Sequence, residues 1–292
     1  MATAVFRIAA LAATITTLAS CRNNAVIRIG LTGAISDSLT ISMKHAADLA
    51  VDEINASGGI DGRRLELVER DDFGNADSAV KIANDFYASD VVAVVGHSFS
   101  GPTIAAAPVY NGGRNPVTQI SPSASSPDVS NAGPYTFRVC PTDLAHGAAL
   151  ARYAWTNLGL RRAAVLYNNN GYGRGIRQTF VDEFTRLGGE LISVDPYLGD
   201  RPDVSPYVER LAKHPADFIV VAGYRSEAEE ILRQARARGV NVPLMGGDGL
   251  EQIEQSGILA EGVYVTAAYS PEISTPANRH FVDAYTRRYP TG

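Results

Sequence analysis

The sequence predicts an α/β protein with two lobes, each built on a parallel sheet flanked by helices, with a hinge and a cleft between them. Short apolar runs alternate with amphipathic helical patterns, which is the order of right-handed βαβ units. The order strand, helix, Gly-Gly, strand, helix, strand, helix, strand occurs twice, from about Val26 to Ile120 and from about Ala163 to Met245. Two lobes that present the carboxyl ends of their strands to each other would enclose a cleft and could close about a hinge.

The first half of the chain begins with an apolar strand, and Gly58-Gly59 ends the helix that follows. The β-branched run Val91–Val95 is typical of a strand buried on both faces. Ser100 then favours a helix start as its N-cap, with Pro102 in the first turn. We expect strands at 26–31, 65–69, 91–95, 116–120 and 135–139, and helices at 40–57, at 76–88 and from residue 100.

The second half repeats this order, and Gly188-Gly189 again ends a helix. The pattern at Ser226–Arg238 strongly predicts a helix, because its glutamates come early and its arginines late, as the helix dipole favours. We expect strands at 162–167, 190–194, 217–221, 242–245 and 262–266, and helices at 143–158, 172–187, 207–212, 226–238 and 277–289.

Composition narrows the class of protein. The chain has 292 residues and a net charge of −5, and it contains no basic block or basic–aromatic stripe, so nucleic acid is not an expected partner. The five histidines are scattered without metal-ligand spacing, and no phosphate-binding glycine motif occurs. We therefore expect neither a metal nor a cofactor.

The N-terminus carries an export signature. Arg7 precedes the apolar segment Ile8–Ala19, which is too short to span a bilayer and is typical of a signal peptide. Leu-Ala-Ser-Cys follows and resembles the bacterial lipoprotein box, in which cleavage precedes the cysteine and lipid is attached to it. We expect a signal peptide at 1–20 and a lipid-anchored protein at Cys21, although a buried N-terminal helix is an alternative. Cys140 then lacks a partner and is expected to be a small buried hydrophobe.

Four loops that follow strands should meet in the cleft: 96–101, 121–126, 223–227 and 246–249. The first two offer hydroxyls, backbone N–H groups and a helix N-terminus, which suit a carboxylate; the expected ligands are Ser100, Ser123 and Ser125. The last two offer Tyr224 and Asp248, which suit an ammonium group. The candidate site therefore fits a zwitterion, although Asp248 in Gly-Gly-Asp-Gly could equally be a turn residue.

The same region allows other interpretations. Gly96-His-Ser-Phe-Ser100 differs at one position from the G-x-S-x-G elbow of hydrolases, in which Ser98 would be the nucleophile. The difference is Ser100, which occupies the position where the sharp turn of the elbow requires Gly. The serines could also simply cap and line a turn. Asp71-Asp72 follows a strand as a phosphoacceptor or Mg²⁺ site would, yet without a matching lysine an Asx turn is the favoured interpretation.

Several motifs together resemble the branched-chain amino acid-binding proteins of bacterial ABC transporters, which have the two-lobed periplasmic-binding-protein type I fold. The motifs are Ile54–Gly62, Arg70-Asp-Asp72, Val95-Gly-His97, Tyr172-Gly173, Ile231–Arg236 and Gly246–Gly249. The resemblance covers nearly all of Val26–Gly292. It implies an extracytoplasmic solute-binding protein without catalysis, which delivers an amino acid or similar small carboxylate to a membrane permease.

The resemblance also implies site roles. Ser100 matches the family's carboxylate-binding serine, and Ser123 and Ser125 match the positions that supply a backbone contact and a hydroxyl. Tyr172 matches an aromatic residue of the cleft on the second lobe. The remaining two positions, Tyr224 and Asp248, match the ammonium-binding tyrosine and acid, although well-studied members carry Glu in place of Asp248. In addition, Leu39 falls where those members have a tyrosine.

The family pattern continues past residue 292, so the chain is expected to be a C-terminally shortened member. The expected domains are 25–141 plus 268–292 for lobe 1 and 142–267 for lobe 2. The expected location is the periplasm or cell surface. A ligand-sensing receptor lobe of the same fold is an alternative function.

Overall fold

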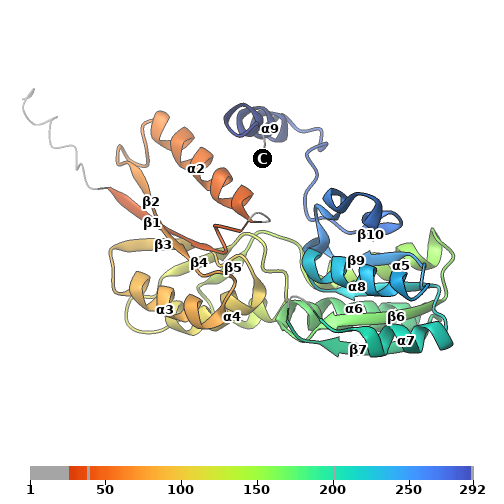
Figure 1. Cartoon of the computed structure of the whole chain (residues 1–292). Coiled ribbons are helices and arrows are strands. Elements are labelled where there is room, and N and C mark those ends of the chain that lie inside the picture. Colours follow the sequence, from red (N-terminus) through yellow and green to blue (C-terminus); the bar gives the residue numbers. More distant parts are fainter. Residues whose placement is uncertain (1–25, 38–39, 200–201, 291–292) are drawn as a thin grey trace, which may run out of the picture.

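The structure, a computed structural model, describes residues 26–37, 40–199 and 202–290, so the lipoprotein box with Cys21 and the loop residue Leu39 lie outside the described residues. Two lobes lie side by side, each with a five-stranded sheet (Figure 1). All strand pairs are parallel, which confirms the predicted fold class.

Lobe 1 has the strand order β2-β1-β3-β4-β5. Its strands are β1 (Ile27–Gly33), β2 (Leu65–Asp71), β3 (Val91–Val95), β4 (Thr118–Ser121) and β5 (Thr136–Arg138). Its helices are α2 (Ile41–Ala56), α3 (Ala76–Tyr87), α4 (Ser100–Asn111) and the short η2 (Pro127–Asn131). Helices α3 and α4 cover one face of the sheet and α2 lies on the other (Figure 1).

Lobe 2 has the order β10-β9-β8-β6-β7, which is the order of lobe 1 seen from the other edge. Its strands are β6 (Arg162–Asn168), β7 (Glu190–Tyr197), β8 (Phe218–Ala222), β9 (Leu244–Gly246) and β10 (Val263–Val265). Its helices are α5 (Asp143–Thr156), α6 (Gly171–Arg186), α7 (Ser205–Lys213), α8 (Arg225–Ala237), η3 (Asp248–Leu250) and η4 (Ile253–Ala260). The shared order confirms the predicted repeat.

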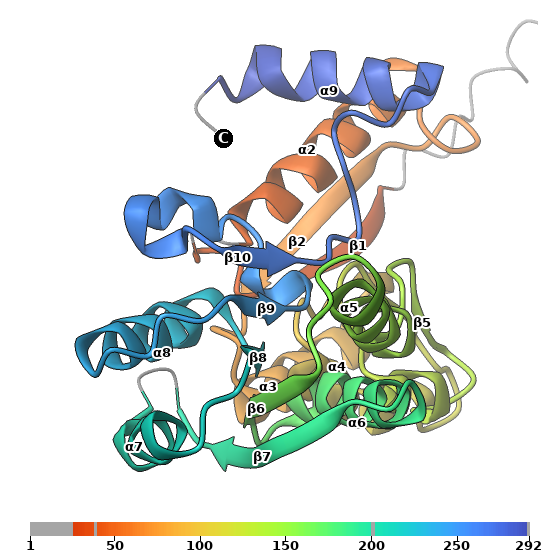
Figure 2. The ribbon, with the colours of Figure 1, turned by 90° about the vertical axis from the view of Figure 1, so that its right-hand side faces the viewer.

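Alternation along the central strand β8 builds two cores in lobe 2. Phe218 and Val220 point to α5 and α6, whereas Ile219 and Val221 point to α7 and α8. All five residues of β8 are buried, as expected for a strand covered on both faces. Figure 2 shows the sheet between these two helical layers.

Two details of the opening strand and helix of lobe 1 differ from expectation. The strand β3 is not buried on both faces, because Val92, at its amino end, is 58% exposed although Val94 on the same face is buried. The N-cap of α4 is Phe99 and not Ser100. Ser100 is the first helical residue, and its hydroxyl oxygen accepts a hydrogen bond from the Ser126 N–H at 3.2 Å.

The last helix, α9 (Pro276–Arg288), returns from lobe 2 and lies against α2 of lobe 1 (Figures 1 and 2). The His45 ring of α2 stacks on Tyr289 with centroids 3.8 Å apart, and its Nδ1 lies 3.3 Å from the Tyr285 hydroxyl. The chain therefore crosses between the lobes after β5 and again after β10, as a hinged pair of lobes requires.

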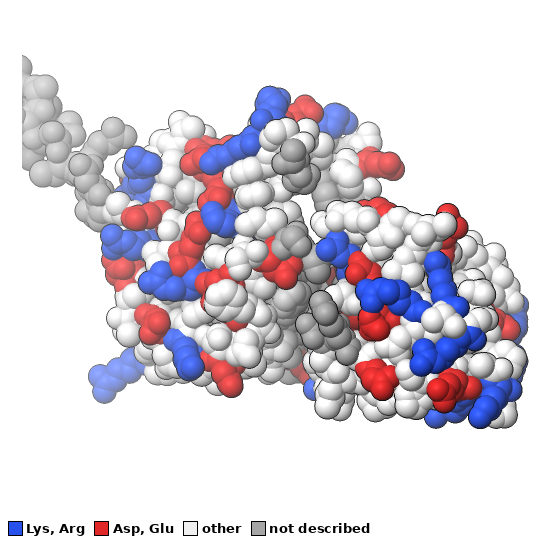
Figure 3. Space-filling view, in the orientation of Figure 1, with Lys and Arg blue, Asp and Glu red and all other residues white. Residues whose placement is uncertain are grey.

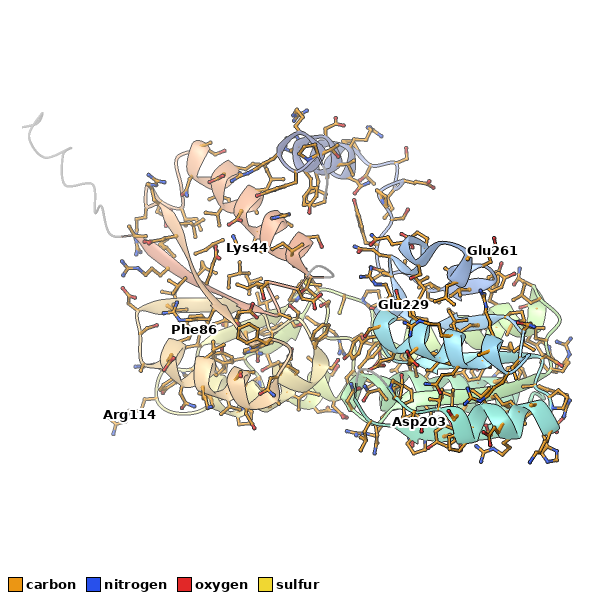
Figure 4. The ribbon with its side chains drawn as sticks, viewed as in Figure 1. Lys44, Phe86, Arg114, Asp203, Glu229 and Glu261 are labelled. Atoms are coloured by element: carbon orange, nitrogen blue, oxygen red, sulfur yellow. The ribbon has the colours of Figure 1, made fainter. Side chains whose placement is uncertain are left out.

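The surface carries charges of both signs. On the face in Figure 3, Lys and Arg side chains are interspersed with Asp and Glu. In Figure 4, Phe86 lies inside lobe 1 while Arg114 projects into solvent. Within the described ranges, no helix is both long and apolar enough to cross a bilayer.

We expect Gly173→Ala to lower the free energy of unfolding by roughly 1–3 kcal/mol, because a Cβ at this position of α6 would lie 2.1 Å from the Asn168 carbonyl oxygen and 2.7 Å from that of Ala222. The matched control is Gly101→Ala in α4, where a Cβ meets nothing within 4 Å and helix propensity favours alanine. Urea denaturation measures both. Equal stability of the two variants would show that α6 does not depend on this close approach.

Candidate functional site

A cavity of roughly 650 Å³ lies between the two lobes at the carboxyl ends of their strands. Residues from all four predicted loops line it, together with residues of α2 and α9. In this conformation the lobes also touch beside the cavity, where the rings of Phe99 and Tyr224 lie 5.1 Å apart. A ligand in the cavity would therefore contact both lobes.

On lobe 2, Tyr172 holds Asp248 in place. The Tyr172 hydroxyl donates to Asp248 Oδ1 at 2.9 Å and accepts from the Gly249 N–H at 2.8 Å. Gly249 permits this approach, because a Cβ there would lie 2.9 Å from the Tyr172 ring and 2.6 Å from the Gly223 carbonyl oxygen. Because burial raises its pKa well above the ordinary value, the Tyr172 hydroxyl remains a proton donor at neutral pH. It thus orients the carboxylate toward the cavity.

A second tyrosine completes this wall of the cavity. Tyr224 stacks on Tyr172 with centroids 5.2 Å apart and an interplanar angle of 19°. Its backbone N–H donates to the buried Glu227 carboxylate at 2.8 Å, and Tyr197 and Asn168 donate to the same carboxylate at 2.6 and 2.5 Å. These contacts join the ends of β6, β7 and β8, so the tyrosine wall is rigidly supported.

On lobe 1, neutral donors face the cavity. Ser100 lies in the first turn of α4, where helix N–H groups carry partial positive charge. The Ser123 hydroxyl donates to the Ser98 carbonyl oxygen at 2.6 Å and also borders the cavity. Among the described residues that line the cavity there is no Lys or Arg, and the charged ones are Asp248 and Glu251. The cavity thus combines an acidic wall on lobe 2 with an uncharged polar wall on lobe 1.

A buried pair supports the lobe 1 wall from behind. His97 Nδ1 lies 2.5 Å from Asp72 Oδ2, with side-chain exposures of 0% and 1%. The His97 carbonyl oxygen accepts hydrogen bonds from Ser121 at 2.6 Å and from Thr103 at 3.0 Å. The pair therefore ties the ends of β2, β3 and β4 to the start of α4. Asp72 Oδ1 also accepts from the Gly74 N–H, which confirms the predicted Asx turn.

Titratable groups gather behind Asp248. His146 Nε2 lies 3.6 Å from Asp248 Oδ2, and His146 Nδ1 lies 2.9 Å from the Thr266 hydroxyl. Asp143 is buried, and burial raises its pKa to about 7; the charge of Asp248 adds to this rise, whereas Ser125 and Arg138 oppose it. The neighbouring Ser125 hydroxyl and both Asp143 oxygens nevertheless fall outside normal hydrogen-bond geometry. Behind Asp248, Asp143 thus adds a further negative charge only when it ionises near pH 7.

The structure brings most of the predicted site residues together. The five that line the cavity are Ser100, Ser123, Tyr172, Tyr224 and Asp248. Ser125 is only 1% exposed and lies behind the wall beside Asp143. Cys140 corrects the expectation of a buried hydrophobe, because it is only partly buried and lines the cavity. Its pKa is raised to about 11, chiefly by burial, so the thiol remains neutral.

Two groups near Asp248, Glu251 and His146, were not predicted from the sequence. Glu251 lines the cavity three residues after Asp248, and a one-turn spacing could have suggested it. His146 reaches Asp248 from a different element, so no local pattern points to it. Ser98, the candidate nucleophile, is 3% exposed, and within the described part of the chain its hydroxyl makes no hydrogen bond to a histidine. That geometry does not favour the hydrolase interpretation.

Comparison with known proteins agrees with this geometry. A family model described as periplasmic binding protein matches residues 27–292. The chain is 31% identical over 265 residues to a Leu/Ile/Val-binding protein of Escherichia coli, covering 88% of this chain and 71% of that one.

Solved structures give the same result. A branched-chain amino acid transporter substrate-binding protein from Streptococcus pneumoniae, in complex with isoleucine, is similar with a TM-score of 0.82 and 31% identity, over 91% of this chain and 78% of that one. A leucine-binding protein from Thermotoga maritima is similar with a TM-score of 0.82 and 28% identity, over 91% and 77% of the two chains.

The raised pKa of Asp143 predicts a pH-dependent stability. The folded protein keeps this proton up to about pH 7, whereas the unfolded chain loses it near pH 4. The free energy of unfolding should therefore fall by roughly 2–4 kcal/mol as pH rises through this window. Asp143→Asn should remove that fall in urea titrations at pH 5–8, and the exposed control Asp85→Asn should retain it. Parallel pH profiles of the wild type and Asp143→Asn would contradict the assignment.

Proposed function

Because the chain belongs to the periplasmic binding protein family that includes the Leu/Ile/Val-binding proteins, we propose that it is the solute-binding component of an ABC transporter. It captures an amino acid or a similar small carboxylate in the cavity between the lobes and delivers it to a membrane permease. The relatives described above are named for binding leucine, isoleucine or valine. This chain is proposed to bind a ligand of the same zwitterionic class.

The observation that supports this proposal most strongly is that an acidic wall on lobe 2 faces an uncharged polar wall on lobe 1 across one cavity. Asp248, oriented by Tyr172, is the ammonium ligand, and Tyr224 adds an aromatic ring beside it. From lobe 1, the Ser100 hydroxyl, the backbone N–H of Ser123 and the first turn of α4 bind the carboxylate, because the Ser123 hydroxyl already donates to the Ser98 carbonyl oxygen. Ser125 acts from behind this wall and supports its backbone.

Binding is coupled to closure. The ligand's two charged ends are held by different lobes, so the full set of contacts exists only when the lobes are together. A ligand shifts the open–closed equilibrium only by the difference between its affinities for the two states. The permease then distinguishes the loaded protein by the closed arrangement of the lobes. We place the lobe boundaries at residues 141/142 and 267/268.

The proposal includes export and anchoring. The N-terminal pattern supports cleavage after residue 20 and lipid attachment to Cys21, which would hold the protein at the periplasmic or cell-surface side of a membrane. The role is binding without catalysis, since Ser98 is buried and the cavity carboxylate has a binding role.

Asp248→Asn should lower the affinity for amino acids at least about 100-fold, because the ligand ammonium would be left without a counter-charge in a largely buried site. The ligand-free melting temperature should stay close to that of the wild type. Isothermal titration calorimetry with leucine, isoleucine and phenylalanine measures the effect, with exposed Asp85→Asn as the control. Unchanged affinity in Asp248→Asn would rule out the ammonium assignment.

A further inference from the structure

A histidine lies directly behind the carboxylate that the proposed site uses for the ligand ammonium. His146 belongs to the first turn of α5, and its Nε2 lies 3.6 Å from Asp248 Oδ2. The two side chains are 4% and 12% exposed. Described residues alone bury this Nε2, and within that part of the chain it has no hydrogen-bond partner. It therefore lies beside the oxygen that Tyr172 leaves open, because Tyr172 donates to Oδ1.

Thr266 controls how the His146 ring can present its proton. The Thr266 hydroxyl lies 2.9 Å from His146 Nδ1, and a hydroxyl can either donate or accept. The Asp248 carboxylate only accepts, so a lone pair on Nε2 would face a second lone pair there. The favoured arrangement of the neutral ring thus has Thr266 donating to Nδ1 and the ring proton on Nε2. A second proton on Nδ1 requires only that the Thr266 hydroxyl rotate and accept.

Few other groups around this pair can change charge between pH 5.5 and 8.0. The titratable or charged groups packed near it are Arg138, Cys140, Asp143, Tyr172 and Glu251. Burial raises the pKa of Cys140 to about 11 and that of Tyr172 well above its ordinary value, so both stay neutral, and Arg138 keeps its charge. Burial also raises the pKa of Asp143 to about 7 and, in the same direction, that of Glu251. Asp143 and Glu251 are therefore the groups from which a role of His146 must be separated.

We propose that protonated His146 and the ligand ammonium compete for the Asp248 carboxylate, so that the affinity for the ligand falls as the pH falls. This inference rests on the proposed function, because it assumes that Asp248 binds the ammonium. A neutral ring directs only an N–H dipole at Oδ2 and helps to position the carboxylate. A protonated ring places a full positive charge 3.6 Å from it, so an arriving ammonium meets a carboxylate that already has a counter-charge and a second cation beside it.

The competition must be reciprocal. If a proton on His146 weakens ligand binding by some factor, the bound ligand weakens binding of that proton by the same factor. Ligand binding at pH 6 should therefore release protons from His146 into the buffer. Coupling between two sites is typically about 5–150-fold, and two cations at one carboxylate should reach at least about tenfold.

Calorimetry at pH 8.0 and 5.5, with the tightest-binding of leucine, isoleucine and phenylalanine, tests the competition. The wild type should bind at least about tenfold more weakly at pH 5.5 than at pH 8.0. His146→Gln keeps a polar side chain but cannot become charged, so it should lose most of this ratio. The matched control is His214→Gln, because His214 is exposed at the end of α7 and its replacement should keep the wild-type ratio.

Two further variants separate His146 from its titrating neighbours. Asp143→Asn and Glu251→Gln should each keep most of the wild-type ratio. Each should also keep the proton release at pH 6, measured as the dependence of the binding enthalpy on the ionisation enthalpy of the buffer. These measurements need no change at His146, so the proposal can still be tested if His146→Gln folds poorly.

Equal affinities at the two pH values in the wild type would overturn the competition and leave the proposed function standing. A wild-type ratio in His146→Gln would do the same, as would loss of the ratio and of the proton release in Asp143→Asn or Glu251→Gln. Failure of all three amino acids to bind at pH 8.0 would instead overturn the proposed function, and this inference with it.

Discussion

The site depends on one hydrogen bond, from the Tyr172 hydroxyl to the Asp248 carboxylate, because it fixes one of the two carboxylates, Asp248 and Glu251, that line the cavity. The same hydroxyl accepts the Gly249 N–H, so the loop after β9 is held to the first turn of α6. Stacking on Tyr224 then brings in the loop after β8, and the contact of Tyr224 with Phe99 extends the wall to lobe 1. A small shift of Tyr172 would therefore move every element of the lobe 2 wall.

In lobe 1, a different set of polar groups holds the strand ends that face the cavity. Lobe 1 has the same strand order, and polar residues again occupy the carboxyl ends of neighbouring strands. There the buried Asp72–His97 pair links three strand ends, and the ligand-facing groups are hydroxyls and N–H groups without net charge. A repeated fold thus places an acidic wall opposite an uncharged polar wall. The asymmetry suits a zwitterion and requires no arginine or lysine at the cavity.

Much of this arrangement could be predicted from the sequence. Apolar runs and Gly-Gly stops located the strands and helices. The strand-end loops identified four predicted residues that line the cavity, and the family resemblance added Tyr172. Contacts between distant elements could not be predicted. The contact of His146 with Asp248 and the packing of α9 on α2 depend on tertiary packing, which local periodicity does not encode. Burial likewise decides that Ser125 lies behind the wall and that Val92 is exposed, because both follow from helix cover and not from the strand pattern.

The most direct test of the central claim, a zwitterion held by both lobes, compares one amino acid with two derivatives that each lack one charged end. We would measure by calorimetry the binding of leucine, of N-acetylleucine and of 3-methylbutylamine, the decarboxylated form of leucine, to the wild-type protein. The account predicts that the free amino acid binds and that each derivative binds at least about 100-fold more weakly, because each leaves one wall unpaired. Binding of either derivative as tight as that of leucine would contradict the account.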